Sequence, residues 1–314
     1  MSDQDINNGP DKEVTTLLAN ISTKLAEDGK DSAAYVVDNS RIRPKSTRVP
    51  LHKYLAQIWR LRHFIVLHSR YKAIADNDDM FLGRLWTILE PICRIAMYGI
   101  MFGLILDTSR GIENFIGFLT IGITFFGFIS RGPNSGSGLV QRTQNLIGTF
   151  NFPRATVVVG EAVRGFYMSL FPALLATVGA LLFQLDKPLS WSIFLMVPLF
   201  MLIQVFATGL MFIAARTTAF FPDLRRMMQF IMRAWFYISG VFFSVERYAN
   251  VPEIQVVMEA NPAYQFLTAL RDSILYASPP SFETWGYLSA WSFGTLLIGF
   301  IFFWHAESRY VHIK

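Results

Sequence analysis

Two pairs of opposite charges inside long apolar stretches are the residues whose types and spacing could do chemistry. Glu90 and Arg94 stand four residues apart in the first such stretch, and Glu161 and Arg164 stand three apart in a later one. Either spacing places both members on one face of a helix, where they can form an ion pair. A charge at the bilayer centre costs about 2.5–3.5 kcal/mol. The pairs therefore either neutralise themselves near the membrane surface or line the inner mouth of a polar pathway.

Motifs for catalysis are missing from the sequence. There is no G-x-x-x-x-G-K-[ST] loop, G-x-G-x-x-G, H-E-x-x-H or C-x-x-C, and the one cysteine is Cys93. The histidines are dispersed, so we expect no metal site. Acidic clusters like the stretch 76–79 bind a divalent cation in metal-dependent glycosyltransferases, but no soluble catalytic domain accompanies this one. Because Asp is favoured at a helix N-terminus, we expect the stretch to cap the helix that enters the membrane. We therefore predict a chain that is not an enzyme.

The composition indicates which elements position the charged pairs. Hydrophobic residues make up 52% of the chain and charged residues only 16%, which is typical of a polytopic membrane protein. A membrane-spanning helix needs about 20 apolar residues. Six apolar runs approach this length, the second being short: 86–106, 115–129, 156–185, 191–215, 227–245 and 285–304. The prediction is an all-α polytopic membrane protein with six transmembrane helices.

The distribution of Lys and Arg predicts the orientation. These residues concentrate in segment 41–84, in loops 131–154 and 216–226, and after the last run, and they are sparse in the alternate loops. Because cytoplasmic loops are enriched in Lys and Arg, both termini are expected in the cytoplasm, which requires an even number of spans. The same distribution explains the net charge of +5 without nucleic-acid binding.

Two segments outside the six runs have helical apolar spacing. In residues 51–72 apolar positions alternate with Lys and Arg, which predicts an amphipathic helix in the headgroup region rather than a soluble helix packed on a partner. Segment 246–283 is broken by prolines, and we expect two short external helices that re-enter the membrane, or an ordinary surface loop. The expected domains are a flexible cytoplasmic tail, 1–50, an interfacial helix and link, 51–84, and a six-span membrane domain, 85–314.

An aromatic face and two inner loops carry the functional hypothesis. At intervals of four, the first run presents polar and aromatic residues that wind slowly around one helix face: Trp86, Glu90, Arg94, Tyr98 and Phe102. Loops 145–154 and 216–226 combine aromatic residues, Pro and Arg, the composition of protein-binding surfaces. A membrane protein with these loops and no phosphate loop suggests half of a transporter whose motor is a separate chain.

Several short motifs follow one another between residues 54 and 310. They are Arg70-Tyr71-Lys72, Leu82-Gly83-x-x-Trp86 with Pro91, Leu146-Ile147 with Phe152-Pro153-Arg154, Asp223-Leu224-Arg225, Ser239-Gly240-Val241-Phe242-Phe243, and Asn261-Pro262 with Arg271. In order and spacing they resemble the ABC type-2 permeases that export polysaccharides such as O-antigen, capsule, teichoic acid and galactan. The acidic stretch within 73–79 departs from the family pattern.

The resemblance implies a homodimer bound to two cytoplasmic ATPase chains, which would hold ATP and Mg, with 51–72 as a gate helix. Coupling to the ATPase would involve Phe152, Pro153, Arg154, Phe221, Pro222, Asp223 and Arg225. The substrate pathway would involve Trp86, Tyr98, Phe102, Phe81, Glu90 and Arg94, and an external gate would involve Asn261, Pro262 and Arg271.

The resulting prediction is a permease subunit that moves a lipid-linked polysaccharide out across the bacterial cytoplasmic membrane. It would contact membrane lipids and need no cofactor of its own. Alternatives are a permease for a lipid or drug, a membrane enzyme acting on lipid-linked sugars through Asp78 and Asp79, and a membrane anchor without transport.

Overall fold

The computed structural model describes residues 19–20, 50–75, 114–144, 153–184, 190–243 and 252–312, and also 89–90, 92–93, 95–97, 100–101 and 112. The chain divides into two compact units, Met1–Lys45 and Ser46–Lys314. All the helices named below belong to the second unit.

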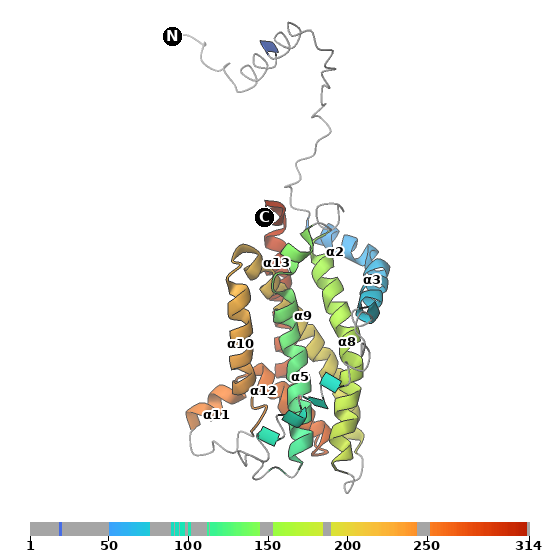
Figure 1. Ribbon diagram of the computed structural model, residues 1–314, viewed down its shortest axis with the longest axis vertical. Helices are drawn as coiled ribbons and strands as arrows, with labels where there is room; N and C mark the ends of the chain where they lie inside the picture. Colours follow the sequence, from blue (N-terminus) through green and yellow to red (C-terminus); the bar gives the residue numbers. More distant parts are fainter. Residues whose placement is uncertain are drawn as a thin grey trace. The chain divides into compact units, whose positions relative to one another are not determined.

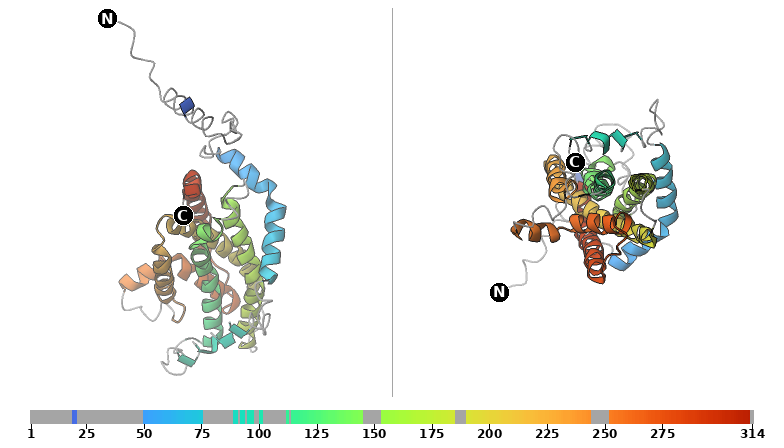
Figure 2. Two further views of the ribbon diagram at one scale, coloured as in Figure 1. Left: turned by 45° about the horizontal axis from the view of Figure 1, so that its top comes forward. Right: turned by 90° about the horizontal axis from the view of Figure 1, so that it is seen from below.

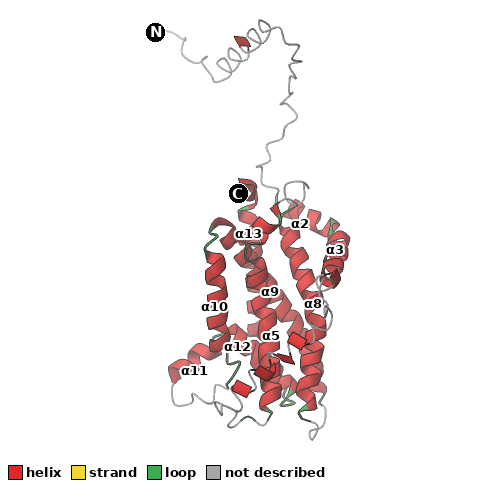
Figure 3. Ribbon diagram, in the orientation of Figure 1, coloured by secondary structure: helices red, strands yellow, loops and turns green. Residues whose placement is uncertain are grey.

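The described residues form helices and no strands, which confirms the all-α prediction (Figure 3). Five helices run side by side in the views of Figure 1 and Figure 2: α5, α8, α9, α10 and α13. The elements are α2 (Leu51–Arg60), α3 (Arg62–Ala75), α5 (Phe115–Gly136), α6 (Leu139–Arg142), α8 (Ala155–Leu182), the 3₁₀ helix η3 (Trp191–Leu195), α9 (Met196–Phe220), α10 (Leu224–Ile238), α11 (Pro252–Glu259), α12 (Pro262–Ile274), α13 (Phe282–His305) and the 3₁₀ helix η5 (Glu307–His312).

Four helical segments among the described residues are long and apolar enough to cross a membrane: Phe115–Gly136, Ala155–Leu182, Trp191–Phe220 and Phe282–His305. They correspond to the second, third, fourth and sixth apolar runs of the sequence. Three of them, Ala155–Leu182, Trp191–Phe220 and Phe282–His305, expose large apolar side chains such as Leu174, Phe194 and Leu297, as expected of helices in contact with lipid, whereas Phe115–Gly136 is largely buried. Most of the first run lies outside the described residues.

The second span is longer than the sequence predicted. Its apolar run ends at Ile129, yet α5 continues to Gly136 through Arg131 and Pro133. Arg131 Nη1 donates hydrogen bonds to the carbonyl of Gly165, 3.1 Å away, and to Oγ of Ser169, 2.8 Å away, both on α8. This charge, which the sequence places in a loop, is satisfied by a neighbouring helix, so the helix does not need to end before it.

The fifth predicted span is not one of the four. Helix α10 has 15 residues, Leu224–Ile238, and a rise of about 1.5 Å per residue gives it too little length to cross hydrocarbon alone. It ends because Gly240 adopts a left-handed conformation, with φ of 63°, a common helix terminator. The prediction of helix through Val245 is therefore wrong for residues 239–243, and residues 244–245 lie outside the described part of the chain.

The amphipathic segment consists of two helices rather than one. The chain bends at Leu61, whose N–H bonds to the carbonyls of Gln57 and Ile58. Helix α3 packs along α8, and Ser69 Oγ donates to the Gly160 carbonyl, 2.8 Å away. Large side chains such as Trp59 and Tyr71 remain exposed. The bend lets α2 meet the end of the bundle while α3 follows its side.

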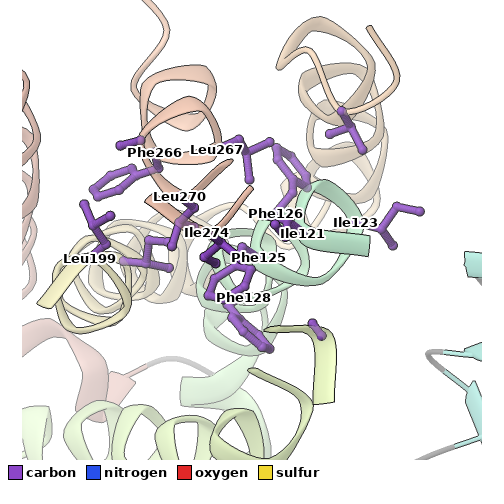
Figure 4. Packing of buried hydrophobic residues seen from close by; sticks show 14 of the residues in the cluster. Ile121, Ile123, Phe125, Phe126, Phe128, Leu199, Phe266, Leu267, Leu270 and Ile274 are labelled. Atoms are coloured by element: carbon purple, nitrogen blue, oxygen red, sulfur yellow. The ribbon is translucent and has the colours of Figure 1, made fainter. Parts of the chain in front are cut away.

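The core lies where α9 packs between α5 and α13 and where α12 crosses α5 and α9. Figure 4 shows Phe125 and Phe126 of α5 among Leu267 and Leu270 of α12. Helices α9 and α13 meet at their backbones, since a Cβ on Gly209 would lie 2.5 Å from the Thr295 carbonyl carbon and the Leu296 nitrogen. Segment 246–283 contains two short helices, α11 and α12, as predicted.

Candidate functional site

A buried carboxylate joins three separate parts of the chain at the end of the bundle where α2 lies. Glu307 Oε2 accepts a hydrogen bond from Tyr54 Oη, 2.7 Å away, and Oε1 accepts one from the Arg154 backbone N–H, 3.1 Å away. The Arg154 guanidinium lies 3.3 Å from Oε1 and also donates to the Glu307 carbonyl. Tyr54 Oη in turn accepts the Ala155 N–H at 3.0 Å. We call these four residues the Glu307 cluster.

The Glu307 cluster locks α2 onto the start of α8 and the C-terminal turn η5. Burial raises the pKa of the Glu307 carboxyl, while the Arg154 N–H and the Tyr54 hydroxyl act in the opposite direction. Burial also raises the pKa of the Tyr54 hydroxyl, and the nearby Glu307 adds to this effect. Tyr54 therefore keeps its proton and remains a donor. This arrangement serves a mechanical connection better than proton transfer.

Both predicted coupling segments reach this end of the bundle where they are described. Pro153 is buried beside the cluster, and Arg154 is a member of it. The second segment reduces to the turn 221–223, because α9 extends to Phe220 and α10 begins at Leu224. Phe221, Pro222 and Asp223 are all exposed. Phe152 lies outside the described residues.

Ring contacts connect the exposed turn to the C-terminal helix. Phe220 packs against Tyr310 of η5, with ring centroids 5.8 Å apart. Tyr310 stacks on Phe303 at 4.8 Å and donates a hydrogen bond to its carbonyl. Helix η5 therefore contacts the start of α8 through Glu307 and the end of α9 through Tyr310. A movement of either segment would therefore displace η5.

Asn261 and Arg271, predicted as external gate residues, meet around the turn that ends α10. Asn261 Oδ1 accepts hydrogen bonds from Trp235 Nε1, 2.9 Å away, and from the Ala263 N–H, 3.0 Å away. Its amide nitrogen donates to Ser239 Oγ at 3.0 Å. Pro262 occupies the first position of α12, where its lack of an N–H costs nothing.

The guanidinium of Arg271 is buried, and its two terminal nitrogens donate to backbone carbonyls. It donates to the carbonyls of Gly240, Val241 and Phe118 and lies over the Phe118 ring, 3.4 Å from its centroid. Three carbonyls from α5 and the α10 turn therefore converge on one cation of α12. Within the described residues, Asn261 and Arg271 join three elements together and present no polar group outward.

One of the two intramembrane pairs is observed. Arg164 Nη1 lies 2.7 Å from Glu161 Oε1, which confirms the expected ion pair along one face of α8. The pair lines a cavity of about 280 Å³ between α3 and α8, whose walls include Phe64, His68 and Lys72. Glu90 is exposed, and Arg94 lies outside the described residues.

A larger cavity, about 490 Å³, opens between α5 and α10. Its lining is unusual for a membrane domain because three arginines share it with uncharged polar groups and, at its other end, apolar side chains. We call it the arginine groove. It is lined by Met97, Ile123, Phe126, Gly127, Ser130, Asn134, Ser137, Arg142, Arg225, Gln229, Met232, Arg233 and Phe236.

The predicted aromatic face of the first apolar run is not placed by the structure. Phe81, Trp86, Tyr98 and Phe102 lie outside the described residues. Among the described residues of that run, Ile95 packs against the core and Met97 lines the arginine groove. Arg225, predicted as a coupling residue, also lines the groove.

Sequence reasoning missed the Glu307 cluster and the position of Arg131. Tyr54 and Glu307 are 253 residues apart in the chain, so no local spacing could connect them. A polar signal did exist, since Glu307 is the one acidic residue in the final basic tail. Its significance depends on burial, which only the packing of η5 reveals.

A family model described as ABC-2 type transporter matches residues 74–275. The chain is 24% identical over 223 residues to the O-antigen export system permease protein RfbA of Myxococcus xanthus, covering 70% of this chain and 83% of the relative. It is 23% identical over 230 residues to the polysialic acid transport protein KpsM of Escherichia coli, covering 69% and 83%.

Proposed function

The chain belongs to the ABC-2 type transporter family, and from this premise we propose that it is the membrane-spanning subunit of an ATP-driven polysaccharide exporter. The cargo would be a lipid-linked polysaccharide that moves from the cytoplasmic to the external side. The observation that carries the proposal is similarity to an O-antigen export system permease protein and to a polysialic acid transport protein, across more than four-fifths of each relative.

The proposed assembly is a homodimer with two copies of a separate ATPase, which would bind ATP and Mg. The exposed apolar faces of the span candidates Ala155–Leu182, Trp191–Phe220 and Phe282–His305 support placement in a bilayer. Basic residues at the ends of the chain and in the inner loops support a bacterial cytoplasmic membrane location with both termini inside.

Contact with the ATPase would occur at the end of the bundle that holds the Glu307 cluster. Phe221 is 65% exposed, beside the exposed Pro222 and Asp223, and an apolar ring flanked by a carboxylate is a typical protein-binding surface. Because Arg154 and Phe220 both contact η5, a push on either inner segment would reach α2. In this proposal α2 and α3 form the gate helix at the cytoplasmic surface.

At the other end of the bundle, Asn261 and Arg271 would hold the external gate. Their hydrogen bonds fix the α10 turn to α12 and α5. The aromatic face formed by Trp86, Tyr98 and Phe102 would contact the sugar rings by apolar stacking. Weak, repeated stacking of this kind allows a polymer to slide.

The test is to purify the chain from its native membrane in mild detergent and identify what accompanies it. We expect a stoichiometric soluble chain that contains a phosphate loop and hydrolyses ATP, together with a glycan-bearing lipid. Recovery of the chain alone, under conditions where a cross-linker also captures no ATPase, would contradict the proposal and favour a membrane enzyme.

Substitutions in the exposed turn test the coupling surface separately. Phe221→Ala and Asp223→Ala are each expected to lower export and ATPase co-purification without changing membrane insertion. Phe282→Ala is the matched control. The Phe282 ring is 97% exposed, but this residue begins α13, at the opposite end of the bundle. Wild-type export in both turn variants would exclude this turn as the coupling surface while leaving the transporter proposal intact.

A further inference from the structure

We propose that the arginine groove is an anion site that binds the phosphate or diphosphate group of the lipid carrier that holds the glycan. This inference rests on the proposed function and adds the chemical group by which the cargo would be recognised. The groove has a volume of about 490 Å³, within the range of small-molecule sites.

The charged side chains that are described in the groove lining are all positive. Arg142, Arg225 and Arg233 line the groove, and none of its described lining residues is acidic. Arg142 Nη2 donates to the carbonyls of Ser135 and Ser137, which fixes that side chain at the groove wall. Neither Arg225 nor Arg233 has a hydrogen-bond or ion-pair partner among the residues that the structure describes. Each of these two guanidinium groups is thus available to the oxygens of a phosphate group.

An orphaned hydroxyl supports a ligand independently of the arginines. Ser137 is only 5% exposed and lines the groove, yet its Oγ is buried without a hydrogen-bond partner in the described structure. A buried hydroxyl normally has a partner, because leaving one unpaired costs free energy. Rotation of the Ser137 side chain toward the groove would let a phosphate oxygen accept this hydrogen bond.

Local backbone geometry makes room for the charged wall. Gly138 has φ of 70°, and a Cβ at this position would lie 3.3 Å from Cδ and Nε of Arg225. Glycine therefore allows both the turn after α5 and the close approach of the arginine. Gly138 therefore allows Arg225 to approach Ser137, and these two residues line the groove.

The opposite end of the groove is apolar, and this favours an amphiphile over a soluble anion. Ile123 and Phe126 of α5, Phe236 of α10 and Met97 line this end. Phe236 lies about three turns from Arg225 along α10, and Arg233 lies between the two, about one turn from Phe236. A phosphate held by the arginines could therefore continue into a hydrocarbon chain along these residues. In the proposed orientation the arginine end faces the cytoplasm, where a lipid-linked cargo would be loaded.

The cavity between α3 and α8 offers a weaker alternative for an anion. Its arginine, Arg164, is already paired with Glu161 at 2.7 Å, and Glu161 adds negative charge to the wall. An anionic headgroup would have to compete with that carboxylate. The arginine groove carries no such internal competitor among its described residues.

The test measures lipid binding to the full-length chain, purified with whatever ATPase accompanies it and reconstituted in nanodiscs. The probes are undecaprenyl diphosphate, uncharged undecaprenol, inorganic diphosphate and phosphatidylglycerol. We expect Arg225→Gln and Arg233→Gln each to weaken undecaprenyl diphosphate binding about tenfold, the order expected for one charge-assisted hydrogen bond. Ser137→Ala is expected to weaken it severalfold, and undecaprenol binding should not change.

Arg226→Gln is the matched control, since Arg226 is the next residue on α10, also exposed, and does not line the groove. Arg225 and Arg233 are exposed as well, so the variants should fold. Equal losses in Arg226→Gln, or none in Arg225→Gln and Arg233→Gln, would overturn the site. Inorganic diphosphate binding as tightly as the lipid would overturn the lipid assignment, and equal affinity for phosphatidylglycerol would overturn the carrier assignment.

Export of surface glycan, measured with the same variants in cells, separates this inference from the proposed function. If the wild-type gene does not restore glycan export to a deletion strain, the proposed function fails. If it does, and Arg225→Gln and Arg233→Gln bind and export as the wild type does, only the anion site fails.

Discussion

Replacing Tyr54 by Phe tests the hydrogen bonds of the Glu307 cluster separately from the packing of the Tyr54 ring. The substitution removes one hydroxyl and keeps the ring, which packs at 6.2 Å from Phe300. Two interactions disappear together: the bond to Glu307 Oε2, 2.7 Å long, and the bond from the Ala155 N–H, 3.0 Å long. Helix α2 then loses its polar attachment to both α8 and η5.

The size of the effect follows from these two bonds. A hydrogen bond to a charged group contributes about 1.5–3 kcal/mol, and a buried donor left unpaired costs about 1–3 kcal/mol. Partial relaxation around Ala155 reduces the sum, so we expect α2 to be destabilised by about 3 kcal/mol. Since about 1.4 kcal/mol corresponds to a factor of ten, local opening of α2 should increase by about two orders of magnitude.

Hydrogen exchange of the α2 amides in nanodiscs measures this opening directly. Tyr71→Phe is the control, because Tyr71 lies on α3 and is 75% exposed. A double-mutant cycle with Glu307→Gln should show strong coupling between positions 54 and 307, since the two side chains touch. Exchange in Tyr54→Phe no faster than in Tyr71→Phe, or additive effects in the cycle, would refute the view that the cluster holds α2.

Two further predictions concern pH and helix packing. Burial raises the pKa of Glu307, so the folded state binds a proton more readily than the unfolded state. The stability that this group contributes is therefore lost as pH rises from about 4.3 through the raised pKa. Glu307→Gln should remove this dependence of stability on pH in thermal-unfolding scans. Gly209→Ala should destabilise the fold by about 1–3 kcal/mol, because the added Cβ meets the α13 backbone at 2.5 Å, whereas Gly294→Ala, with open space around it, should change stability by less than about 0.5 kcal/mol; equal unfolding of the two variants would refute the close helix contact.

The lengths of the apolar runs predict the four span candidates of the structure. The predicted end of the span Phe115–Gly136, however, comes too early in the chain. The apolar run that ends at Ile129 predicts a short span, with Arg131 in the loop that follows it. In the structure Arg131 is bound by Gly165 and Ser169 of α8, so the helix continues. A sequence window shows that a charge is present but not whether another helix supplies its partner.

Helix α10 illustrates the opposite error. Its apolar residues continue past Ile238, so hydropathy extended the helix to Val245. The left-handed Gly240 ends it, and the carbonyls of Gly240 and Val241 turn toward Arg271 instead of continuing the helix. A single cation from α12, more than thirty residues later, uses the backbone groups that this turn leaves open.

What the sequence alone determined are the properties that depend on near neighbours in the chain. Apolar run length predicted an all-helical membrane protein, spacing predicted the Glu161–Arg164 pair, and ordered motifs pointed to the transporter family. Tertiary structure alone decided which distant groups meet: Tyr54 with Glu307, Asn261 with Ser239, and Arg142 with Arg225 and Arg233 in one groove. The physical reason is that burial and pairing set the energy of a polar group inside a membrane protein, and both depend on residues far away in the chain.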